Sequence, residues 1–318
     1  MGEMSTTPRY VPSPGEMVFV SIRCIQARYL LRPSKRVNKL ILGVLAKAQK
    51  KYEVRVFAPA FLSNHGHMLL WFRDAEQQAK FMHFVDGNIA REVGRLHGWK
   101  GKFWDGPFAS TIVANDEASQ VKMLRYLLEQ GCKEGLVARP QDWPGVHAAS
   151  ILLSARNPKG IWVDRTGLYE ARRRKGNQGK VRPLDFEEEL ELKLSPLPCW
   201  EHLSEQEYLE RISEIVQEIE EKTAARHREE ESRPLGRGAV LRQNPRFEPD
   251  EPKQGPLPLV HAATREMRRR YLEALAIFLR AYREASSRFR SGEKGVQFPH
   301  GCFPPAGPFL RAHGPPAT

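Results

Sequence analysis

The sequence predicts an α+β fold with an antiparallel sheet, on three observations. Short apolar and β-branched runs alternate with longer stretches of helical periodicity in the first half of the chain. Up to about residue 114 the expected order of elements is β-α-β-β-α-β. The second half is instead punctuated by proline, glycine and charged runs. The order in the first half is the split β-α-β pattern of ferredoxin-like domains, with helices expected on one face of the sheet and the other face open.

Hydrophobic spacing assigns the first four elements. Residues 17–24 alternate between apolar and polar side chains, as in a half-buried strand, and Arg23 lies on the polar side. Apolar residues over 37–45 recur at i, i+3, i+4, i+7 and i+8, the stripe of an amphipathic helix. Residues 52–58 and 61–73 are predicted as two strands, and the second combines a histidine pair with a strongly apolar run.

Three further elements complete the first half. A polar and apolar pattern over residues 75–97 predicts a long helix, and the β-branched run 108–114 predicts a strand. Residues 116–130 predict another helix, which Gly131 would stop.

The second half is expected to be mainly helical and rich in loops. We place a domain boundary near residue 150, which gives parts 1–150 and 151–318. The second part combines a basic loop, an acidic helix over 208–222, a proline-rich linker, a basic helix over 262–290 and a tail rich in proline and glycine. The basic helix could bind DNA, but packing against the acidic helix is the slightly favoured interpretation.

The charge favours a polyanionic partner. The chain of 318 residues carries a formal charge of +12 and has a pI near 9.6. Clustered Lys and Arg neutralise phosphates and release condensed counterions, although a basic protein without a nucleic-acid partner is the alternative. Its four cysteines are scattered and no apolar run approaches the length of a membrane span, so a cytoplasmic protein without membrane contact is expected.

A candidate active site combines a strand and a helix. His65 and His67 are one residue apart, so on a strand they face the same way at roughly 6.6 Å along the backbone. Tyr126 and Gln130 are four apart and would share one face of a helix. If the helix lies across the strand, His65, His67 and Gln130 can hold a divalent ion beside the Tyr126 hydroxyl.

Each half of this site also has an ordinary structural interpretation. A histidine pair on a strand is often only a polar pair in a stable fold, and a tyrosine on an amphipathic helix can simply pack at its rim. The order and spacing of the two motifs together favour a catalytic site. Imidazole and amide ligands with open positions suit Mg²⁺ or Mn²⁺ rather than a closed zinc site. A tyrosine that attacks a phosphodiester conserves the bond energy as a phosphotyrosine, which suits strand transfer.

Basic residues around this site are candidate contacts to DNA phosphates. Lys122 and Lys133 are expected on the same side of the helix as Tyr126, where a charge could bind phosphate or lower the pKa of the phenol. A solvated charge run is the more common explanation for the basic loop. The candidate phosphate contacts are Lys122, Arg23, Lys133, Arg172, Arg173, Arg174 and Lys175.

Over about residues 15–147 the chain resembles the HUH single-strand endonucleases. The resemblance is to the Y1 transposases of the IS200-like family, and within them to the REP-associated tyrosine transposases. It rests on Leu-Ser-Asn-His-Gly-His-Met-Leu-Leu at 62–70, Gly-Lys-Phe-Trp at 101–104, Arg-Tyr-Leu-Leu at 125–128, Lys-Glu-Gly-Leu-Val at 133–137 and Arg-Pro-Gln-Asp-Trp-Pro at 139–144.

The resemblance implies a transposase of the bacterial cytosol or nucleoid. Its substrate would be single-stranded DNA with hairpins, cut with a divalent metal to leave a 5′-phosphotyrosine and a free 3′ hydroxyl. Two departures stand out. Gly66 lies between the histidines, where the family usually has a bulky apolar residue, and Gln130 precedes Gly-Cys where the REP-associated branch more often has Asn-Pro-Val.

Other functions remain open on the sequence. A non-catalytic module that binds single-stranded DNA or RNA could use the same scaffold, although RNA readers of this shape carry stacking aromatics on a central strand where this chain has histidines. A replication initiator or relaxase is a third candidate. The sequence leaves a monomer and a homodimer equally open.

Overall fold

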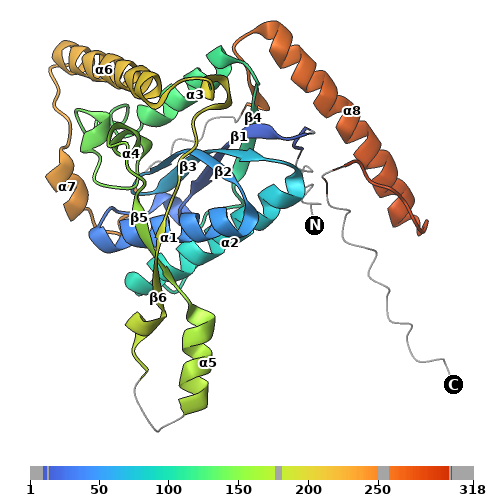
Figure 1. The fold of residues 1–318 in the computed structure, drawn as a ribbon, viewed down its shortest axis with the longest axis horizontal. Coiled ribbons are helices and arrows are strands. Elements are labelled where there is room, and N and C mark those ends of the chain that lie inside the picture. The colour runs from blue at the N-terminus through green and yellow to red at the C-terminus, as the bar shows by residue number, and fades with distance from the viewer. Residues whose placement is uncertain (1–9, 13, 176–180, 250–257, 301, 303–318) are drawn as a thin grey trace.

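The protein is built on one five-stranded sheet in the order β2-β3-β1-β4-β7, shown in Figure 1. This computed structural model describes residues 10–12, 14–175, 181–249, 258–300 and 302. The pairs β1–β3, β1–β4 and β2–β3 are antiparallel, and β7 is parallel to β4. The first four strands have the order of a split β-α-β domain, so the predicted fold is confirmed. The strands are β1 (Glu16–Arg23), β2 (Arg55–Phe61), β3 (His65–Phe72), β4 (Ala109–Val113) and β7 (Val260–His261).

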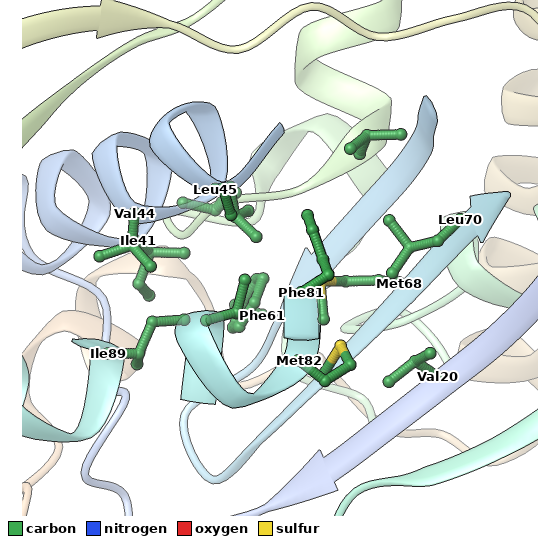
Figure 2. Packing of buried hydrophobic residues seen from close by; sticks show 14 of the residues in the cluster. Val20, Ile41, Val44, Leu45, Phe61, Met68, Leu70, Phe81, Met82 and Ile89 are labelled. Atoms are coloured by element: carbon green, nitrogen blue, oxygen red, sulfur yellow. The ribbon is translucent and has the colours of Figure 1, made fainter. Parts of the chain in front are cut away.

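Two helices cover one face of the sheet, as predicted. They are α1 (Lys35–Tyr52) and α2 (Ala75–Leu96), whose first turns are capped by the side chains of Ser34 and Asp74. Figure 2 shows how their apolar stripes meet the sheet. The buried residues labelled there are Val20, Ile41, Val44, Leu45, Phe61, Met68, Leu70, Phe81, Met82 and Ile89.

The opposite face of the sheet is also covered, so the expectation of an open face was wrong. The covering helices are α3 (Glu117–Leu128), α4 (Ala148–Leu153) and α6 (Glu205–Glu229). The reason lies in the strands, because Phe19, Phe57 and Leu69 point to this side and would otherwise face water. Apolar side chains from the covering helices, Leu124 and Ile212 among them, bury them in a second core.

A two-stranded arm lies against α1. Its strands are β5 (Lys159–Val163) and β6 (Glu187–Glu191). Gly43 and Gly160 let the two backbones touch, since a Cβ at Gly160 would lie 2.0 Å from the Gly43 nitrogen. Glu187 and Glu188 of β6 form ion pairs with Arg36 and Lys47 of α1.

The basic run after β5 is helical and does not form the predicted loop. It belongs to α5 (Arg165–Lys175), whose helical pattern includes an Arg174–Glu170 ion pair at i,i+4. Figure 1 shows α5 at the tip of the arm, on the other side of the molecule from α3.

The basic helix α8 (Arg265–Arg290) does not pack against the acidic helix, which corrects the favoured interpretation. Glu218 and Lys222 of α6 pair with residues of α3 and its end, Arg125 and Glu129. The start of α8 instead contacts β7 at the edge of the sheet. Figure 1 shows the rest of α8 projecting away from α6. No helix in the described ranges is both long and apolar enough to span a membrane.

Candidate active site

Strand β3 presents both histidines to the sheet face that α3 covers. His65 and His67 pair with Arg23 and Ser21 of β1, and their ring centroids are 4.8 Å apart. The two side chains therefore face the same way, as the spacing of one residue predicts.

Both imidazoles are held neutral at neutral pH. Burial, followed by the positive charge of Arg23, lowers the pKa of His65 to about 4. Burial also lowers the pKa of His67 well below its ordinary value, and the positive charges of Lys133 and Arg23 add to the shift. Each ring consequently has a lone pair for a cation without first losing a proton.

Hydrogen bonds orient His65 toward Gln130. The Nδ1 atom of His65 lies 2.7 Å from Oδ1 of Asn64, which fixes the ring. Gln130 is buried, and its Nε2 donates to the carbonyl of Tyr126 at 3.0 Å. The Gln130 side chain also contacts His65, and this contact partly opposes the lowering of the His65 pKa.

Gln130 follows the end of α3, just before a turn. Helix α3 ends at Leu128, and the chain turns at Gly131, whose φ of +88° is costly for other residues. Gln130 and Lys133 therefore lie just beyond the end of α3 rather than within it, and both still contact Tyr126 as expected.

Tyr126 stands beside the histidines. Its ring lies edge-on to His67 at 6.0 Å between centroids and to Phe19 at 5.7 Å. The Nζ atom of Lys133 lies 4.5 Å from the centroid of the Tyr126 ring, a cation–π contact. The structure thus brings His65, His67, Tyr126 and Gln130 together.

The candidate phosphate contacts divide into two groups. Arg23 and Lys133 lie at the site, since both charges act on the histidines, and Lys122 is exposed one turn before Tyr126 on α3. The structure does not bring Arg172, Arg173 and Arg174 to the site, because they lie on α5 at the far end of the arm. The side chain of Lys175 lies outside the described residues.

The donor atoms fit a divalent ion. A ring nitrogen of His67, Nδ1, is buried and has no hydrogen-bond partner within the described part of the chain. Such an atom costs about 1–3 kcal/mol unless a ligand uses it. No group of three or more His, Cys, Asp or Glu side chains suited to a metal occurs in the described ranges. The available set is therefore neutral, with two imidazoles and one amide, and leaves the charge of a Mg²⁺ or Mn²⁺ ion for phosphate oxygens.

Sequence reasoning missed two aromatic neighbours of the site. Phe19 stacks on His67 at 5.1 Å between centroids, and His261 meets Phe19 edge-on at 5.6 Å. Phe19 lies within the alternating pattern of β1 and could have been placed on the site face by its parity with Arg23. No local sequence pattern predicts His261 at the site, because it lies on a two-residue strand far along the chain.

Phe61 explains the glycine between the histidines. Gly66 pairs with Phe61 across β2 and β3, and a Cβ at Gly66 would lie 2.7 Å from Cε1 of that ring. Phe61 belongs to the core under α1 and α2, on the face away from the histidines. Its ring fills the volume that the resemblance assigns to a bulky residue at position 66.

A side chain at Gly66 should therefore overpack the core. We expect Gly66→Val to lower the free energy of unfolding by about 1–3 kcal/mol, because the added side chain would meet the buried Phe61 ring. Urea unfolding measures the change. In combination with Phe61→Leu the valine should cost less, and an equal cost in both backgrounds would contradict this account.

Acid should destabilise the protein through a buried histidine outside the site. Burial lowers the pKa of His147 to about 4, and its Nδ1 accepts a hydrogen bond from the Ala149 amide as the cap of α4. The unfolded chain binds this proton near pH 6.5, so stability is present above that pH and falls toward pH 4, by roughly 3 kcal/mol for the full shift. Urea unfolding between pH 7 and pH 4.5 should show a shallower decline in His147→Asn, whereas exposed His202→Asn should follow the native curve.

Comparisons with known proteins find similarity in structure alone. No family model matches the chain, and no curated protein matches it. The chain is similar to the solved structure of a REP-associated tyrosine transposase bound to a REP hairpin, with 16% identity over 45% of this chain and 81% of the other, at a TM-score of 0.38. It is also similar to a Deinococcus radiodurans R1 protein proposed to be a transposase, with 13% identity over 41% of this chain and 98% of the other, at a TM-score of 0.28. Both proteins are described as transposases, and each match leaves more than half of this chain uncovered.

Proposed function

We propose that this protein is a transposase-type enzyme that cleaves and rejoins single-stranded DNA carrying a hairpin, through a phosphotyrosine at Tyr126. The observation that supports this most is the meeting of two neutral imidazoles, the Gln130 amide and the Tyr126 ring on one face of the sheet. A nucleophile and a neutral ligand set lie side by side, as phosphodiester chemistry requires.

The proposed cleavage exchanges one phosphoester bond for another. The Tyr126 oxygen attacks the phosphorus and loses its proton to solvent, while the bond to the 3′ oxygen breaks and that oxygen takes up a proton. The DNA 5′ phosphate stays on the tyrosine, and attack by a 3′ hydroxyl reverses the step, so a strand is rejoined without ATP. A Mg²⁺ or Mn²⁺ ion held by His65, His67 and Gln130 would supply charge that stabilises the phosphate oxygens.

Neighbouring side chains restrict the tyrosine ring. Phe19 packs edge-on to it, and Lys133 lies over its face. Both contacts limit rotation of the ring, which lies beside His67. The positive charges of Lys133 and Arg23 also attract a phosphate to this end of the sheet.

The alternative, a non-catalytic module for single-stranded nucleic acid, is less well supported. Readers built on this scaffold stack bases on an open sheet face. Here α3, α4 and α6 bury that face in a second core. What stays half-buried beside the core is the tyrosine and His65.

The test is a covalent adduct. Native protein is mixed with hairpin single-stranded DNA and Mn²⁺, with a label at the 5′ end in one reaction and at the 3′ end in the other. We expect a denaturant-resistant adduct that carries only the 3′-end label, since the protein keeps the 5′ phosphate side of the cut. EDTA should remove it. Binding without any adduct would favour the non-catalytic module.

A further inference from the structure

The last strand of the sheet attaches the C-terminal part of the chain to the candidate active site. Strand β7 pairs with β4, and the Ala114 amide donates to the His261 carbonyl at 2.8 Å. The Ala263 amide donates to Oγ of Ser119 on α3 at 2.7 Å, and Thr111 donates to the Pro258 carbonyl at 3.1 Å. These bonds fix the start of α8 against the helix that carries Tyr126.

A cavity of about 220 Å³ lies at this junction. It is large enough to admit a single phosphate group. Its lining combines apolar and polar side chains from α3, β7 and the first turn of α8. They include Ser119, Lys122, Val260, His261 and Arg268.

The charged groups of the cavity have one sign. Lys122 and Arg268 come from different helices, and within the described ranges neither forms an ion pair. No acidic side chain lines the cavity. Two cations that line one cavity without an acidic side chain favour the binding of an anion there.

The cavity lies next to the tyrosine. Lys122 precedes Tyr126 by one helical turn, about 6 Å along α3. His261 reaches from the cavity to Phe19, which also contacts the Tyr126 ring. A strand whose cleaved phosphate lies at Tyr126 would therefore pass the cavity within a nucleotide or two.

We infer that this cavity binds one backbone phosphate of single-stranded DNA next to the cleaved phosphate, with Lys122 and Arg268 as its cationic ligands. His261, Val260 and Ala262 bound the side where the sugar lies. The C-terminal part of the chain thus completes the substrate path of the catalytic domain. This inference rests on the proposed function, because the strand is placed by its cleaved phosphate.

The experiment is a scan with neutral phosphates. A fluorescein-labelled hairpin oligonucleotide with single-stranded flanks binds the native full-length chain in EDTA, and a single methylphosphonate is moved along the flank. Fluorescence anisotropy should show one position where affinity falls roughly tenfold. Lys122→Ala and Arg268→Ala should each weaken binding to the unmodified strand about as much and reduce the salt slope by about one. Both variants should lose most of the effect of that methylphosphonate.

Arg269→Ala is the matched control. Arg269 is the neighbour of Arg268 on α8 and is also exposed. It does not line the cavity, and it pairs with Glu273 at 3.6 Å. It should bind like the native protein and keep the sensitive position. A flat scan, or cavity variants with native affinity, would overturn the inference even if the covalent adduct forms. If the sensitive position disappears in the cavity variants but the native protein forms no adduct, the phosphate site would stand and the proposed strand cleavage would be wrong.

Discussion

Tyr126→Phe should abolish the covalent adduct and reduce strand cleavage by at least about a thousandfold, because it removes the attacking oxygen. Binding to the hairpin DNA should stay within about twofold. The phenyl ring keeps the edge contacts with His67 and Phe19 and still lies under the charge of Lys133. A gel assay of adduct and cleavage products, read beside anisotropy on the same protein, separates the two effects.

A second tyrosine provides the control for this substitution. Tyr169 lies on α5, is 65% exposed and is remote from α3. Tyr169→Phe makes the same chemical change and should retain native adduct formation. An adduct that persists in Tyr126→Phe would mean that another side chain is the nucleophile, and the proposed function would need a different site.

The sequence was sufficient to predict the framework of the fold, because periodicity is a local property. Alternation over 17–24 matches β1 to within one residue at each end, and the helical stripe over 37–45 falls inside α1, which continues to Tyr52. The histidine pair could be placed on one face for the same reason, because side chains two positions apart on a strand point to the same side of the sheet.

Features that depend on distant segments were not predictable in this way. The covering of the second sheet face requires α6, whose apolar stripe reads equally well as a partner for α8. The helix before Gln130 ends at Leu128, two residues before the predicted end, so Gln130 lies outside it. The cavity at His261 needs a parallel pairing between residues about 150 positions apart, which no local pattern encodes.

His65→Ala and His67→Ala should separate chemistry from binding. Each removes one of two imidazoles from a neutral three-ligand set, so we expect cleavage to fall at least about a hundredfold. Loss of a residue that only supports a metal ligand typically costs less, about 10- to 100-fold. Affinity for hairpin DNA should fall by no more than a few-fold, because backbone charges supply most of it. His67→Ala also removes the buried ring nitrogen that has no partner in the described part of the chain. The free energy of unfolding of this variant in EDTA should therefore fall less than the loss of a buried side chain alone predicts.

Metal binding provides a readout that does not depend on cleavage. Titration calorimetry with Mn²⁺ alone should give one site on the native protein and at least tenfold weaker binding in either variant. His97→Ala is the control, because burial also lowers the pKa of that histidine although it lies at the end of α2. The two imidazoles are neutral in the fold, so native affinity for Mn²⁺ should change little between pH 8 and pH 6.5. Affinity that fell steeply over that interval, or equal affinity in all three variants, would place the ion on other side chains.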